Sequence, residues 1–224
     1  MVKCFMVSGT GPGAGRTTVG CALAFAFKVR AMRVGVIKPA ATGCAERNGV
    51  LVSDDAAALL AASSSDLPLE LAAPWCARSP LAPLDAALAD GVAAPDYAAI
   101  ERALREIANR SDVMLVEDSF GLAAKVDSTH DFADMARAHG LELILVIGVS
   151  AKRPGFADAA KRALDYAAAR GIPVRGAILN ALDPQASATI AQDAAALGRA
   201  TGVRVLGTMR FKEPLSLAIV EQLL

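Results

Sequence analysis

The sequence predicts an α/β protein in which a mostly parallel sheet is covered by helices on both faces, giving three layers. Short segments rich in Val, Ile and Leu alternate along the chain with longer segments rich in alanine. The short segments are almost continuously apolar, which is typical of strands buried on both faces, whereas a half-exposed strand alternates apolar and polar residues. Because strands that alternate with helices are joined by crossovers, neighbouring strands are expected to run parallel.

The predicted elements follow from these patterns and from the residues that end them. Strands are predicted at residues 3–8, 33–38, 112–117, 141–149, 174–180 and 203–208. Helices are predicted at residues 15–30, 96–109, 156–170 and 185–201. Pro95 precedes the second of these helices, and Gly171 and Gly202 stand where the third and fourth should end.

The segment from residue 44 to residue 95 has a different composition. It contains the run SSSD, several prolines and no strong strand pattern. Two short helices are predicted here, at residues 54–62 and near 84–89, with loops between them. Long excursions at the carboxyl end of a strand often carry function, so this segment is expected to border a binding site.

Size and composition limit the possible classes of protein. The chain has 224 residues, of which 54% are hydrophobic and 21% are charged. These values fit one domain spanning residues 1–224 with a sizeable core. The formal net charge is zero, so no long-range field attracts nucleic acid or an anionic membrane, and neither is expected as a partner.

The predicted location is the cytoplasm. No apolar run approaches the roughly 20 residues that cross a bilayer, and the opening segment is too short for a signal peptide. The four cysteines show no CxxC spacing. Without a secretion signal they are expected to be reduced thiols.

A glycine-rich stretch, SGTGPGAGRTT, occupies residues 8–18 between the first predicted strand and the first predicted helix. Backbone N–H groups at the start of a helix point outward, and the helix dipole favours an anion there. Glycines let the backbone approach phosphate oxygens closely, and Thr17 and Thr18 stand where a magnesium-binding hydroxyl belongs. The stretch therefore predicts phosphate binding rather than a plain tight turn.

Three nucleotide motifs compete for this stretch: a Walker A loop, a dinucleotide fingerprint and a loosely matched short-chain dehydrogenase pattern. A Walker A loop, GxxxxGK[ST], is one residue shorter than the interval from Gly9 to Gly15 and has a lysine where this chain has Arg16. A dinucleotide fingerprint is matched from Gly9 to Ala14, but it requires an acidic residue near the end of the second strand, where this chain has Lys38. Neither tyrosine has the lysine four positions later that a short-chain dehydrogenase needs. Phosphate cradling is favoured, with a dehydrogenase as a distant alternative.

Further segments resemble dethiobiotin synthetase. The family's GTxxxxGKT loop is matched by GTGPGAGRT at residues 9–17, and its KPxxSG segment by KPAATG at residues 38–43. Its SDAxxL helix start is similar to SDDAAAL at residues 53–59, and its LVEGAGG motif is echoed by LVEDSFG at residues 115–121. A Phe-Ala-Asp at residues 132–134 and Asn180 at the end of a late strand complete the series. The matches run in order over most of the chain.

The resemblance implies a P-loop NTPase-like fold and an ATP- and Mg²⁺-dependent ligase. In that family CO₂ forms a carbamate on a diamine, 7,8-diaminononanoate. The carbamate oxygen attacks the γ-phosphate of ATP, and the second amine then displaces phosphate and closes the ureido ring of dethiobiotin. The family is homodimeric, so a second copy of the chain is the expected partner, with the diamine bound near the interface.

The resemblance also assigns roles to individual residues. Phosphate binding is expected at Gly13, Ala14, Gly15, Arg16, Thr17 and Thr18, and adenine recognition at Asn180. The metal ligands are expected to be Thr17, Asp55 and Glu117, which offer the oxygen atoms that Mg²⁺ prefers. The catalytic residues are expected to be Lys38, Arg16 and Thr10, and the substrate contacts Thr10, Lys38 and Thr42. Lys38 would spread the negative charge that develops during phosphoryl transfer.

Some of these residues have a structural alternative. Asp54 is the alternative to Asp55 as a metal ligand, and Ser53, Asp54 or Asp55 could simply cap the following helix. Asn180 could equally cap the turn that precedes Pro184.

Three segments depart from the family pattern. Arg16 replaces a lysine, and a forked guanidinium is not a conservative substitute for a compact ammonium. Residues 118–121 read DSFG where the family has Gly-Ala-Gly-Gly, so two glycines are lost and Asp118 is added. Residues 151–158, AKRPGFAD, lack the family's Asn-His pair. These departures support a second hypothesis, a divergent P-loop protein that binds nucleotide with weak or different activity.

Overall fold

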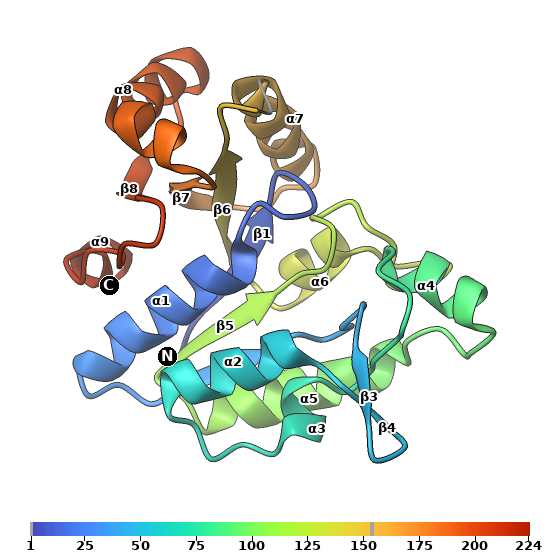
Figure 1. Cartoon of the computed structure of the whole chain (residues 1–224). Helices are drawn as coiled ribbons and strands as arrows, with labels where there is room; N and C mark the ends of the chain where they lie inside the picture. The colour runs from blue at the N-terminus through green and yellow to red at the C-terminus, as the bar shows by residue number, and fades with distance from the viewer. Residues whose placement is uncertain (1, 153–154) are drawn as a thin grey trace.

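The computed structural model describes residues 2–152 and 155–224, and its centre is a six-stranded parallel sheet with the strand order β2-β5-β1-β6-β7-β8 (Figure 1). The strands are β1 (Lys3–Gly9), β2 (Val34–Ile37), β5 (Val113–Glu117), β6 (Glu142–Val149), β7 (Val174–Ala181) and β8 (Val205–Met209). The predicted fold class, a mostly parallel sheet between helices, is therefore confirmed.

Helices flank the sheet on both sides. They are α1 (Arg16–Val29), α2 (Asp54–Ser63), α3 (Leu69–Ala72), α4 (Pro83–Asp90), α5 (Tyr97–Asn109), α6 (Phe132–Ala138), α7 (Phe156–Ala169), α8 (Pro184–Thr201) and α9 (Ile219–Leu223). The six strands and six helices that the sequence predicted are all present, with ends within two residues of the predicted ones.

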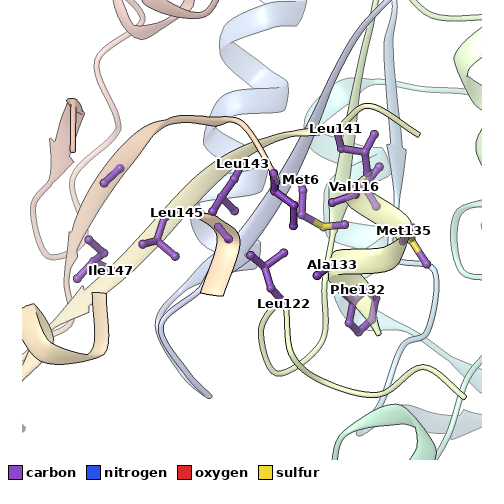
Figure 2. Close-up of a cluster of buried hydrophobic side chains, with 14 of the residues drawn as sticks. Met6, Val116, Leu122, Phe132, Ala133, Met135, Leu141, Leu143, Leu145 and Ile147 are labelled. Atoms are coloured by element: carbon purple, nitrogen blue, oxygen red, sulfur yellow. The ribbon is translucent and has the colours of Figure 1, made fainter. Parts of the chain in front are cut away.

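Two hydrophobic clusters hold the layers together, one on each face of the sheet. Phe5 and Val7 of β1 pack with residues of α1, α2 and α9, whereas Met6 between them packs with residues of α5, α6, α7 and α8. Figure 2 shows part of the second cluster, where Met6 of β1 lies between Leu143 of β6 and Val116 of β5. Because successive side chains of a strand point to opposite faces, a nearly continuous apolar strand serves both clusters.

The strand order places a site at one edge of the sheet. The chain leaves β1 towards β2 on one side, and after β5 it crosses to β6 on the other side of β1. Ligands of open α/β sheets bind at such a switch point, beyond the carboxyl ends of the strands. The loop after β1 lies at this edge, together with the ends of β2 and β5.

One sequence prediction is wrong in the segment from residue 44 to residue 95. A two-stranded antiparallel hairpin, β3 (Ala45–Arg47) and β4 (Val50–Val52), lies where no strand was predicted. Its turn is Asn48-Gly49, with φ values of 52° and 79°, which is the favoured composition for a two-residue hairpin loop. The strands have three residues each, too few for an alternation of apolar and polar residues to be visible. The helices α3, α6 and α9 have four, seven and five residues, too few to show a clear helical periodicity, and they were not predicted either.

Candidate functional site

The loop between β1 and α1 exposes the amino end of a long helix. Gly13 and Gly15 have φ values of 73° and 89°, a region that favours glycine. Gly15 is the N-cap residue of α1 and, within the described chain, no side chain caps this helix. Thr10 N–H donates to the carbonyl of Val146 at 3.1 Å, which ties the start of the loop to β6. The first N–H groups of α1 are thus left to bind an anion.

Asn180, near the end of β7, contacts this loop through its side-chain amide. Its Nδ2 donates to the carbonyl oxygen of Ala14 at 3.1 Å, and the side chain is buried. A Cβ atom at Gly15 would lie 2.1 Å from Asn180 Nδ2, so only glycine fits at this position. In this structure the amide holds the loop; the adenine contact expected from the sequence stays a prediction.

Four side chains from four elements meet beside the amino end of α1. Lys38 follows β2, Glu117 ends β5, Asp55 lies in the first turn of α2 and Thr17 in the first turn of α1. Lys38 Nζ lies 2.5 Å from Glu117 Oε1 and 2.7 Å from Asp55 Oδ2. The Thr17 hydroxyl donates to the same Glu117 oxygen at 2.8 Å. The structure therefore brings together the three predicted metal ligands and the predicted catalytic lysine.

The charges of this cluster stabilise one another. Burial alone would lower the pKa of Lys38, but Glu117 and Asp55 outweigh it, and the pKa is raised above its ordinary value. Burial would raise the pKa of Asp55, but Lys38 outweighs it, and that pKa is lowered. Lys38 and Asp55 are therefore both charged at neutral pH.

The oxygen atoms of the cluster fit a magnesium ion that is shared with phosphates. Within residues 2–152 and 155–224, no group of three or more His, Cys, Asp and Glu could enclose a metal. Mg²⁺, however, is usually held by one or two carboxylates together with phosphate oxygens and water. Glu117 Oε2 is buried and has no hydrogen-bond partner, so the cluster contains an acceptor that a cation could satisfy.

Arg16 folds back over the loop instead of extending away from it. Its Nη1 donates to the carbonyl of Gly11 at 3.2 Å, and its Nε lies 3.4 Å from Asp118 Oδ1. Burial raises the pKa of the Asp118 carboxyl, and the nearby guanidinium opposes this rise. The two charged residues that depart from the expected motifs thus contact each other, and no sequence pattern predicts this pairing.

A comparison with protein families identifies the class of this chain. A family model described as an AAA domain (AAA_26) matches residues 3–217. The protein belongs to this family, which includes dethiobiotin synthetase. Among solved structures, the chain is similar to one titled the MinC:MinD cell division protein complex of Aquifex aeolicus, with a TM-score of 0.54 and 15% sequence identity. The match covers 100% of this chain and 85% of the other and supports the P-loop NTPase-like fold.

The remaining predicted residues of this AAA-domain protein lie around the same edge. Thr10 lines two pockets: one of about 160 Å³ with Gly148 and Phe156, and one of about 310 Å³ with Phe120 and Tyr166. The other predicted residues differ in exposure: Thr18 is exposed and Thr42 is half-buried.

Ser53, Asp54 and Asp55, whose roles the sequence left open, make different contacts at the start of α2. Ser53 is the N-cap of α2, and its hydroxyl accepts a hydrogen bond from Ala56 N–H at 3.2 Å. Asp54 pairs with Arg47 of the hairpin at 2.7 Å, whereas Asp55 pairs with Lys38. Asp55 is therefore the aspartate that faces the site.

Part of the divergent segment AKRPGFAD, residues 153–154, lies outside the described residues. In the described part of the chain no helix has the length and apolar character needed to cross a membrane.

Proposed function

We propose that this AAA-domain protein is an ATP- and Mg²⁺-dependent ligase of the dethiobiotin synthetase type, which closes a cyclic urea from 7,8-diaminononanoate and CO₂. The observation that carries the proposal is the convergence of Thr17, Lys38, Asp55 and Glu117 beside the uncapped amino end of α1. Phosphoryl transfer depends mainly on positioning and charge neutralisation, and this arrangement offers both.

The amides from Gly13 to Thr18 bind the phosphates of ATP, and Asn180 contacts the adenine or fixes the loop. The Thr17 hydroxyl and the carboxylates of Asp55 and Glu117 would hold Mg²⁺, which neutralises phosphate charge. Proton loss from the first amine and bond formation to CO₂ give a carbamate, which Thr10 and Thr42 orient.

Lys38 acts where negative charge develops. The carbamate oxygen bonds to the γ-phosphorus as the bond to the ADP oxygen breaks, and the Lys38 ammonium stabilises the transferred oxygens. The second amine then attacks the carbamate carbon, loses its proton and expels phosphate, which closes the ring. In the structure Lys38 is held by two carboxylates, so it is positioned before substrate arrives.

The alternative is a divergent nucleotide-binding protein with weak or different activity. It is favoured by the replacement of the loop lysine by Arg16, because a forked, planar guanidinium is not a conservative substitute for a compact ammonium.

Titration calorimetry with ATP and Mg²⁺ tests the site, and an assay of ADP release with bicarbonate and 7,8-diaminononanoate tests the reaction. We expect ATP binding that Lys38→Ala and Glu117→Ala weaken. Asp112→Asn is the matched control, since Asp112 precedes β5 at the opposite edge of the sheet and pairs with the exposed Arg33. Equal affinity in all variants contradicts the site. Tight ATP binding without diamine-dependent ADP release contradicts the ligase and supports the alternative.

A further inference from the structure

Arg16 and Asp118 form a buried ion pair at the mouth of the phosphate-binding loop. The exposed fractions of their side chains are 11% and 0%, and Arg16 Nε lies 3.4 Å from Asp118 Oδ1. A buried charge without a partner is strongly unfavourable, whereas a buried pair is tolerated. Each residue therefore offsets the energetic cost of burying the charge of the other.

Gly9 has no side chain, and this leaves room for the Arg16 side chain against the end of β1. A Cβ atom at Gly9 would lie 2.9 Å from both Cγ and Nη1 of Arg16, so the arginine lies directly against the end of β1. Its Nη1 reaches across the loop to the carbonyl of Gly11 at 3.2 Å. The guanidinium thus spans the loop from Gly11 to Asp118, which the single point charge of a lysine cannot do.

Asp118 is fixed independently of Arg16. Its Oδ1 also accepts a hydrogen bond from Gly121 N–H at 3.1 Å, and its own N–H donates to the carbonyl of Val7 at 3.3 Å. Phe120 and Gly121 have φ values of 72° and 100°, so the loop after β5 turns tightly at these two residues. The backbone contacts of Asp118 therefore fix its carboxylate in place, and this carboxylate in turn orients the Arg16 guanidinium.

We propose that Asp118 is a positioning residue that holds the Arg16 guanidinium across the phosphate-binding loop, so that residues 16 and 118 act as one coupled unit in nucleotide binding. The inference rests on the proposed ATP binding at this loop. With arginine at residue 16, the carboxylate directs the cation. With lysine at residue 16, the same carboxylate would draw the ammonium away from the phosphates or stand unpaired beside them.

The coupling predicts that removal of the carboxylate has opposite effects in two backgrounds. D118G and D118N should each weaken ATP binding roughly tenfold or more in the wild-type background. R16K alone should also weaken it. In the R16K background, D118G should instead strengthen ATP binding, because it releases the ammonium towards the phosphates. Titration calorimetry at a temperature where every variant is folded measures these four changes.

Thermal unfolding without nucleotide gives an independent readout. D118N should lower Tm by roughly 6 °C or more, because it leaves a buried guanidinium unpaired. D118G should lower Tm less in the R16K background than in the wild-type background. Asp112→Asn, in the exposed pair with Arg33, is the control that should change neither ATP affinity nor the effect of R16K.

The possible outcomes separate the two proposals. If D118G changes ATP affinity by the same factor in both backgrounds, the residues are independent and the inference is wrong. If D118N lowers Tm but leaves ATP affinity unchanged, Asp118 is only structural and the positioning role is wrong. If the wild-type chain binds no ATP, the proposed function fails and the positioning role with it, while the coupling in Tm still decides whether the two residues form a unit.

Discussion

Lys38 and Glu117 are in direct contact, with 2.5 Å between Nζ and Oε1, although 79 residues separate them in the sequence. Both side chains are almost fully buried, with exposed fractions of 5% and 2%. Removing one member of a buried pair leaves an uncompensated charge, which costs more than the pair contributes. The contact is therefore both a stability element and a part of the proposed site, and the two roles can be measured separately.

Glu117→Gln tests the stability role. We expect the free energy of unfolding to fall by roughly 3 kcal/mol, the lower end for a broken buried pair, because Asp55 still faces Lys38. Urea denaturation measures the change. Asp112→Asn removes a carboxylate from the other end of the same strand, where the pair is exposed. A similar loss in both variants would mean that the Lys38–Glu117 pair is no more important than a surface contact.

Gly15→Ala tests the fit between the loop and Asn180. The new Cβ would lie 2.1 Å from Asn180 Nδ2 and the backbone has a φ of 89°, so strain and overlap act together. Gly49→Ala is the matched control, since Gly49 has a φ of 79° and nothing within 4 Å of a new Cβ. We expect G15A to lose roughly 1–3 kcal/mol more than G49A in urea denaturation, and only G15A to lose ATP affinity. Equal losses would contradict the packing described here.

Asn180→Asp tests the hydrogen bond that supports the loop. The side-chain nitrogen that donates to Ala14 becomes a carboxylate oxygen, which faces a carbonyl and adds negative charge near the phosphate site. We expect N180D to weaken ATP binding more than N180A, which removes the whole amide group without adding a charge, at a cost of about 1–3 kcal/mol in stability. Titration calorimetry compares the two. If N180A proves the more damaging for ATP, the amide oxygen rather than the charge is important, as an adenine contact requires.

Asp127→Asn tests the acid sensitivity of the loop between β5 and α6. Burial would raise the pKa of Asp127, but hydrogen bonds from His130 and Thr129 lower it to about 2, against an ordinary value of 3.8. A folded-state pKa below the unfolded value contributes stability above the unfolded value, and this stability is lost as the pH falls from 3.8 towards 2.

The wild-type chain should therefore lose about 1 kcal/mol more than D127N across that window. Urea denaturation at several pH values measures the difference. Asp85→Asn in α4, an exposed aspartate, is the control. A D127N profile parallel to that of the wild type would show that these hydrogen bonds do not stabilise the carboxylate.

The sheet and most of the proposed site could be predicted because they depend on local patterns. Buried parallel strands are apolar throughout, and their carboxyl ends meet at one edge. Residues that directly follow β2 and β5, such as Lys38 and Glu117, must therefore lie near the loop after β1. The choice of Asp55 came from the resemblance to the SDAxxL helix start, and α2 does begin at residue 54.

The contacts between side chains could not be predicted in the same way. Arg16 and Asp118 were each recognised as departures, but no spacing rule indicates that the first residue of α1 pairs with a residue of the loop after β5. Asn180 was placed at the end of its strand, yet its contact with Ala14 depends on how closely the loop approaches β7. The Asn48-Gly49 turn is different, since its sequence is a known hairpin signal and could have revealed β3 and β4.

The position of β5 between β1 and β2 has a consequence for synthesis of the chain. The two early strands each pair with β5 and not with each other. A nascent chain on the ribosome that ends before residue 113 therefore contains the glycine loop and Lys38 but lacks the strand that joins them and the carboxylate of Glu117. The proposed nucleotide site can therefore be completed only after about half of the chain has been translated.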